Sequence, residues 1–195
     1  LQSIEISGPH NEFISSYVLS SNFVNLHSFA LDVRGLPKDE IFYEIFENQP
    51  PNYHLQNLKL GGFFFQRQNV KRILLKYPVI RNLELIDWGN ESLADMLDFI
   101  SKNLVQLENL SITEISSNTK FNALKKLNVN HIRNSAKLIE FIVENEGIEM
   151  LQIGLVYISQ IQNLIKDLKS LSNIKHLSIG GNKTALRAIL NNLML

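Results

Sequence analysis

The feature of this sequence that most constrains its fold is a short pattern of apolar residues that occurs eight times. Each copy has an aliphatic residue at its first place, an aliphatic or aromatic residue at its fourth and an aliphatic residue at its sixth. The copies are Leu1-Ile4-Ile6, Leu26-Phe29-Leu31, Leu55-Leu58-Leu60, Ile80-Leu83-Leu85, Leu107-Leu110-Ile112, Leu124-Leu127-Val129, Ile148-Leu151-Ile153 and Ile174-Leu177-Ile179. They start 25, 29, 25, 27, 17, 24 and 26 residues apart. This spacing is typical of a repeat array whose stacked copies share one continuous core.

Each copy predicts a short β-strand with one buried face. Side chains alternate along a strand, so the fourth and sixth residues share one face and the third, fifth and seventh share the other. The intervals between copies carry apolar residues at helical spacing, as at Val70, Ile73 and Leu74. The same spacing occurs within residues 13–18, 41–46, 93–104, 138–142, 158–168 and 186–190. Strands and helices are therefore expected to alternate.

One interval departs from this alternation. Only 17 residues separate Leu107 from Leu124, and the turn-forming run from Ser116 to Thr119 lies between them. We therefore expect a loop and no helix in this interval. In the next interval, Asn134 is expected to cap the helix, because its side chain can accept a hydrogen bond from a backbone N–H of the first turn.

The alternation of strands and helices resembles leucine-rich repeats, most closely the helix-backed repeats of F-box and ribonuclease-inhibitor-like proteins. The resemblance implies an α/β fold, a right-handed solenoid of about eight repeats with a parallel sheet on its concave side and helices on its convex side. It covers nearly the whole chain, so residues 1–195 are expected to form a single domain. The ends lack the polar capping units of a free solenoid, so we expect this segment to be part of a longer chain.

The ninth place of each copy departs from the family pattern. Family members usually carry Asn or Cys there, and in this chain only Asn182 fits. The other ninth places hold Pro9, Arg34, Phe63, Trp88, Ile115, Ile132 and Val156. We therefore expect bulky packing where family members have a polar ladder.

The composition favours protein partners. The chain has 19 Lys and Arg and 19 Asp and Glu, so its formal net charge is zero and no overall field draws it to nucleic acid or to an anionic membrane. No apolar run approaches the roughly 18 residues of a membrane span. The absence of cysteine excludes disulfides and thiolate sites. It also favours an intracellular location, cytoplasmic or nuclear.

The exposed face of the strands is the predicted binding surface. Eight strands about 4.8 Å apart give a sheet roughly 35 Å wide, enough for a folded domain or a long peptide. The candidate partner-binding residues are Asn57, Lys59, Asn82, Glu84, Ile86, Asn109, Ser111, Asn128, Met150, Gln152 and His176.

Two groups within this set have alternative interpretations. The amides of Asn57, Asn82 and Asn109 can bind the backbone of an extended partner, or they can satisfy one another along neighbouring strands. Ile86 and Met150, and in addition Leu155, are apolar at places that should be exposed to solvent. They are either interface anchors or the result of divergent packing.

A second candidate group lies at the eighth place of three successive copies: Asp87, Glu114 and His131. Two carboxylates beside an imidazole can hold a metal ion or act as acid and base. The simpler hypothesis, which we favour, is a solvated acidic rim that pairs with a basic partner.

Together these patterns predict a noncatalytic protein-binding platform with no cofactor, no metal and no catalytic residue. The resemblance implies a narrower role, the substrate-recognition arc of an F-box-type ubiquitin ligase subunit, which requires an F-box outside this segment. A receptor-like or structural repeat module, a sensor or scaffold, is the alternative. The glycosylation-type sequons that begin at Asn90, Asn109 and Asn182 would fit that alternative.

Overall fold

A single parallel β-sheet runs through the computed structural model, which describes residues 2–7, 25–32, 53–61, 67–86, 93–156, 164, 166–168 and 171–180. Its eight strands are arranged in chain order and every neighbouring pair is parallel. The strands are β1 (Ser3–Ser7), β2 (Ser28–Asp32), β3 (Asn57–Gly61), β4 (Asn82–Ile86), β5 (Asn109–Ile112), β6 (Lys126–Ile132), β7 (Met150–Val156) and β8 (His176–Ile179). The chain therefore has an α/β fold compatible with a repeat solenoid.

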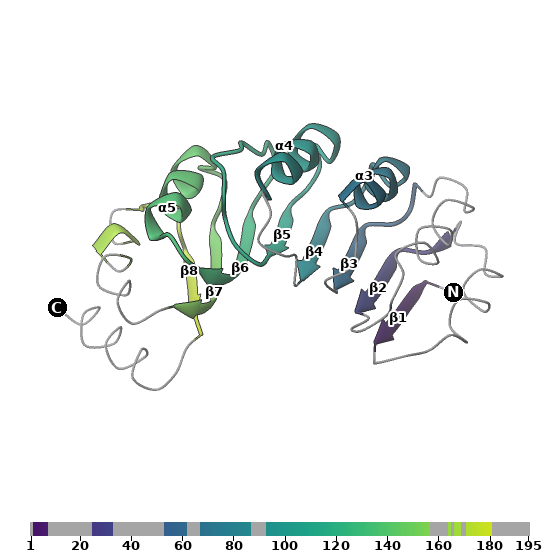
Figure 1. The fold of residues 1–195 in the computed structure, drawn as a ribbon, viewed down its shortest axis with the longest axis horizontal. Helices are drawn as coiled ribbons and strands as arrows, with labels where there is room; N and C mark the ends of the chain where they lie inside the picture. Colours follow the sequence, from purple (N-terminus) through teal and green to yellow (C-terminus); the bar gives the residue numbers. More distant parts are fainter. Residues whose placement is uncertain are drawn as a thin grey trace.

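Three helices lie along one side of this sheet, on the outer side of an arc (Figure 1). They are α3 (Arg67–Lys76), α4 (Leu93–Asn103) and α5 (Ser135–Glu144), each in an interval where the sequence predicts a helix. Residues 164 and 166–168 are also helical. The helices predicted within residues 13–18, 41–46 and 186–190 lie outside the described residues.

The register of the sheet follows the repeated pattern. Asn57 pairs with Asn82, Asn82 with Asn109, and the pairing continues through the third places of every strand from Ser3 to His176. The fifth places pair in the same way. The predicted register is thus confirmed along all eight strands.

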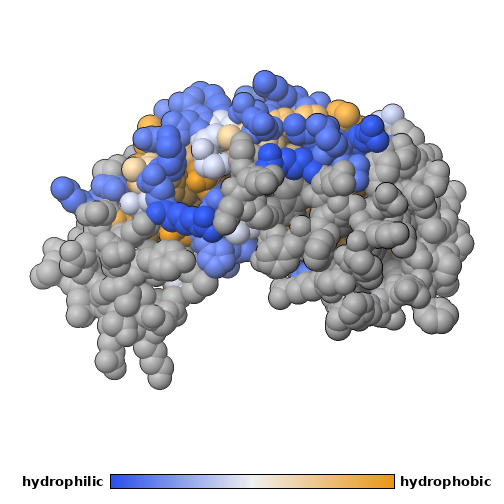
Figure 2. All heavy atoms as spheres, viewed as in Figure 1, coloured by the Kyte–Doolittle hydropathy of each residue, from blue (hydrophilic) through white to orange (hydrophobic). Residues whose placement is uncertain are grey.

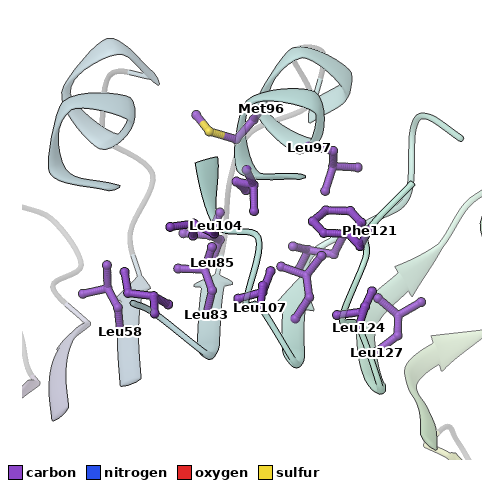
Figure 3. Close-up of a cluster of buried hydrophobic side chains, with 14 of the residues drawn as sticks. Leu58, Leu83, Leu85, Met96, Leu97, Leu104, Leu107, Phe121, Leu124 and Leu127 are labelled. Carbon is purple, nitrogen blue, oxygen red and sulfur yellow. The ribbon is translucent and has the colours of Figure 1, made fainter. Parts of the chain in front are cut away.

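The core lies between the sheet and the helices. Fourth-place side chains such as Leu83 and Leu110 are 1–2% exposed and belong to the same buried cluster as Met96 and Leu97 of α4. Figure 3 shows Leu83, Met96 and Leu97 within this cluster. Two of the apolar ninth places contribute as predicted, since Ile132 is buried and Ile115 packs against the core. Pro9, Arg34, Phe63, Trp88 and Asn182 lie outside the described residues.

One fourth-place residue departs from the buried pattern. Leu177 of β8 is 40% exposed. Among the described strands, β8 pairs on one side only, with β7, so Leu177 has fewer neighbours than its equivalents.

The short interval between β5 and β6 is a loop without a helix, as the sequence predicts. Phe121 of this loop is only 6% exposed and packs against Phe141 of α5, with ring centroids 6.0 Å apart. An aromatic side chain from the loop therefore fills part of the layer that a helix fills in the neighbouring repeats (Figure 3).

Asn145, at the C-cap of α5, holds this loop in place. It is 2% exposed, its Oδ1 accepts the backbone N–H of Phe121 at 2.7 Å, and its Nδ2 donates to the carbonyls of Thr119 at 3.0 Å and Phe141 at 2.8 Å. Asn134 caps the other end of α5 as predicted, because its side chain accepts the N–H of Lys137 at 3.3 Å.

Further side-chain contacts hold the loop from both flanking helices. Thr119 donates to Asp98 of α4, and Asn118 donates to Glu140 of α5 at 3.0 Å. The hydrogen bond from Lys137 lowers the pKa of Glu140, and the one from Asn118 adds to that shift. Because Glu140 is charged at neutral pH, these bonds are retained until the solution becomes acidic.

Tyr77 makes the stability of the fold sensitive to alkaline pH. Its side chain is 1% exposed, and burial raises the pKa of its hydroxyl from 10.0 to about 12. The unfolded chain therefore loses this proton near pH 10, whereas the folded chain keeps it until about pH 12. The stabilisation is complete below pH 10 and is lost as the pH rises through 12.

We expect Tyr77→Phe to remove this part of the alkaline destabilisation. The wild-type free energy of unfolding should fall between pH 10 and pH 12 by about 2–3 kcal/mol more than that of the variant, since one pKa unit corresponds to about 1.4 kcal/mol. Urea titrations at several pH values measure the difference. Tyr53→Phe is the matched control at a tyrosine that is 66% exposed, and it should follow the wild-type profile. Parallel pH profiles of wild type and Tyr77→Phe would contradict the assignment.

Candidate functional site

The sheet has an open face, defined here as the side away from α3, α4 and α5, on which the third, fifth and seventh places lie. A hollow of about 450 Å³ crosses this face from β1 to β6. In Figure 2 the coloured, described part of the surface in view is mainly hydrophilic, with apolar side chains among the hydrophilic ones. The predicted residues that line the hollow are Asn57, Lys59, Asn82, Glu84, Asn109, Ser111 and Asn128. Glu5, Ser28, Ala30 and Lys126 line it as well.

The floor of the hollow is strand main chain. Phe29, Leu58, Leu83 and Leu110 border it, but their side chains are buried on the helix side and are only 1–2% exposed. Short side chains beside them, such as Ala30, let the hollow reach the backbone. The parallel ladder already pairs these strands with one another, so the floor of the hollow presents no unpaired strand edge.

Three asparagines form a hydrogen-bonded row along the third places. Asn109 Nδ2 donates to Asn82 Oδ1, Asn82 Nδ2 donates to Asn57 Oδ1, and Asn57 Nδ2 donates to the carbonyl of His27 at 3.3 Å. The amides therefore satisfy one another, in agreement with the second of the two interpretations of this row. Each amide uses one of its two N–H groups in this row, so the second is available to a partner.

The fifth places form two cross-strand pairs. Lys59 Nζ lies 3.9 Å from Glu84 Oε2, and both side chains are about one third exposed. Asn128 donates to the hydroxyl of Ser111 at 3.1 Å. An ion pair this exposed contributes at most about 1 kcal/mol, but it places two opposite charges side by side in the middle of the hollow, where they offset one another.

Four predicted residues lie on the open face without bordering the described part of the hollow. Met150 and Gln152 of β7 and His176 of β8 are exposed, and Met150 reaches 42%. Ile86, at the end of β4, is half-buried. Met150 is the better anchor of the two apolar candidates, because more of its side chain is available to a partner.

The predicted rim group is only partly described. Asp87 lies outside the described residues. The backbone N–H of His131 donates to the carbonyl of Thr113 at 2.8 Å, which sets His131 beside Glu114. Glu114 Oε2 lies 3.1 Å from Arg133 Nε, and the Glu114 side chain is only 18% exposed. Its charge is therefore compensated within the chain, and the described residues contain no cluster of three or more His, Cys, Asp or Glu that could hold a metal ion.

The opposite edge of the sheet carries a row of charges that the sequence analysis missed. At the second places of the five copies that contain β4 to β8, just before each strand, the side chains alternate in the sign of their charge: Arg81, Glu108, Lys125, Glu149 and Lys175. Arg81 and Lys125 lie 3.0 and 3.5 Å from the Glu108 carboxylate, and Lys175 lies 2.8 Å from Glu149. The Lys175 hydrogen bond lowers the pKa of Glu149, so this pair is present at neutral pH. A comparison of the second places of successive copies would have shown that the charges alternate in sign.

Within the described helices, none is both long enough and apolar enough to cross a membrane. Comparison with known proteins finds no family model, no curated protein and no solved structure that matches this chain.

Proposed function

We propose that this protein is a noncatalytic protein-binding platform of the leucine-rich-repeat type, a right-handed solenoid that receives its partner on the open face of its sheet. The observation that carries the proposal is the hollow across β1 to β6, most of whose lining residues are polar. Among them, Asn57, Asn82 and Asn109 bond to one another, and Asn128 bonds to Ser111. The in-register parallel sheet with helices on one side supports the repeat type.

Preorganisation is the physical reason why this face suits binding. Ordering side chains at an interface costs about 0.5–1.5 kcal/mol for each long side chain that becomes fixed. The asparagine row, the Lys59–Glu84 pair and the Ser111–Asn128 pair are already ordered in the free protein. A partner therefore meets a surface that needs little rearrangement.

A narrower form of the proposal is the substrate-recognition arc of an F-box-type ubiquitin ligase subunit. It rests on the resemblance of the helix-backed repeats, and it requires an F-box outside residues 1–195. Reading the complete open reading frame for an F-box tests it. Glycan mass at Asn90 or Asn182 would instead support the alternative, a receptor-like or scaffold module.

We expect Ser111→Arg to abolish partner binding, because it places a long charged side chain inside the hollow. Ser111 is half-buried on the open face, and its hydroxyl accepts a hydrogen bond from Asn128. The substitution therefore leaves the apolar core unchanged, and the sheet should fold. Ser101→Arg on α4 is the matched control on the helix side, where the wild-type hydroxyl bonds the carbonyl of Asp98 at 3.1 Å.

The measurement is affinity capture from cell extract followed by quantitative mass spectrometry. Proteins retained by wild type and Ser101→Arg but reduced at least tenfold with Ser111→Arg are partners of the open face. Equal capture by all three proteins would contradict the proposal, provided that circular dichroism shows all three folded.

A further inference from the structure

The hollow has opposite charges at its two ends. Glu5 of β1 borders one end and Lys126 of β6 borders the other. Within the described part of the chain, neither side chain has an ion-pair partner. Every other charge that lines the hollow belongs to the Lys59–Glu84 pair, whose members cancel.

The row of lining residues between the two ends is neutral and polar. Ser28, Asn57, Asn82 and Asn109 occupy the successive third places, and each asparagine has one N–H group outside the row of amide bonds. These groups can donate to carbonyl oxygens on a partner without discriminating between side chains. The sign of charge at the ends therefore carries most of the selectivity.

The bonding groups along the hollow favour an extended occupant. An α-helix uses its backbone carbonyls in its own hydrogen bonds, whereas an extended segment leaves carbonyls free to accept from the asparagine row. Glu5 and Lys126 are separated by five strand spacings, about 24 Å at roughly 4.8 Å each, which an extended chain covers in about seven residues.

We infer that the hollow binds an extended segment of a partner protein that crosses the strands, with a basic side chain beside Glu5 and an acidic side chain beside Lys126, about seven residues apart. This inference rests on the proposed function and adds the chemistry and polarity of the partner. The segment is held by two terminal charge pairs and by hydrogen bonds from the asparagine row to its backbone carbonyls.

The test selects a displayed library of random twelve-residue peptides on wild type, Glu5→Lys and Lys126→Glu. Two charge-reversed controls lie on α4, where Asp95 and Lys102 are exposed and outside the hollow. These controls are Asp95→Lys, which matches Glu5→Lys, and Lys102→Glu, which matches Lys126→Glu.

Wild type and both controls should enrich peptides with one basic and one acidic residue about seven positions apart. Lys126→Glu should bind such a peptide about tenfold more weakly and regain affinity when the acidic residue of the peptide is changed to lysine. Glu5→Lys should regain affinity when the basic residue is changed to glutamate. Restoration by the matching peptide is a readout that a folding defect would not produce.

Two results would overturn the inference. In the first, Glu5→Lys and Lys126→Glu enrich the same peptides as wild type, which would show that the charges at the ends of the hollow do not select the peptide. In the second, wild type enriches no peptide, so that the occupant is not an extended segment. Neither result would contradict the proposed platform function, which the Ser111→Arg capture experiment tests separately with intact proteins.

Discussion

Leu110→Ala is expected to destabilise the fold by about 3–4 kcal/mol. Leu110 is the fourth-place residue of β5, and its side chain is 1% exposed within the continuous core. Its replacement removes apolar contacts and leaves a cavity, and buried leucine-to-alanine substitutions of this kind cost about 2.7–5 kcal/mol. The cost should lie near the middle of this range, above its lower end, because the neighbouring fourth-place leucines on β4 and β6 are held in register by the sheet and cannot collapse fully into the cavity.

Leu177→Ala provides a matched control for this prediction. Leu177 occupies the same place in β8 but is 40% exposed, so the same truncation should cost only about 1 kcal/mol. Urea denaturation followed by circular dichroism measures both changes. Equal losses of stability at the two positions would contradict the assignment of Leu110 to a core that Leu177 only borders.

Asn145→Ala is expected to cost about 3 kcal/mol. The substitution leaves the backbone N–H of Phe121 and the carbonyl of Thr119 buried without their partner. Each such group costs about 1–3 kcal/mol when it is not satisfied. Amide hydrogen exchange should locate the effect, because the Phe121 N–H should lose its protection before the neighbouring strands do.

Asn103→Ala separates this role from ordinary capping. Asn103, at the end of α4, donates from Nδ2 to the carbonyl four residues earlier, Phe99, at 2.8 Å, as Asn145 does to Phe141. It has no loop to hold, so its replacement should cost about 1 kcal/mol. If Asn145→Ala were no more harmful than Asn103→Ala, the loop would not depend on the buried amide.

The sheet could be predicted from the sequence because a strand has a fixed period. Side chains alternate strictly along a strand, so placing a copy correctly assigns its third, fifth and seventh residues to the open face. A shift of one residue would expose Leu83 and Leu110. The same reasoning places Asn57, Asn82 and Asn109 in one row. It does not decide where their amides point, since a row of asparagines can bond to itself or to a partner.

The buried role of Asn145 was missed, although the sequence carries a signal for it. The residue three places before a copy is apolar or aromatic at Phe23, Tyr77, Leu104, Phe121 and Leu171 and polar at Asn52 and Asn145, and Tyr77, Leu104 and Phe121 are buried. Asn145 occupies this place in the interval that follows the short one. A polar residue there indicates a buried hydrogen bond that holds the neighbouring loop. Comparing intervals as well as copies would have found it.

The sequence by itself determined the number of strands, their register and the side of the sheet on which each of their residues lies, because strand periodicity and apolar burial act locally and repeat. Only the tertiary structure decided which polar groups meet. Glu114 pairs with Arg133, Lys59 with Glu84, and Glu5 and Lys126 stand at opposite ends of one hollow. Long side chains have several rotamers of similar energy, so their partners are chosen by the curvature and stacking of the assembled strands.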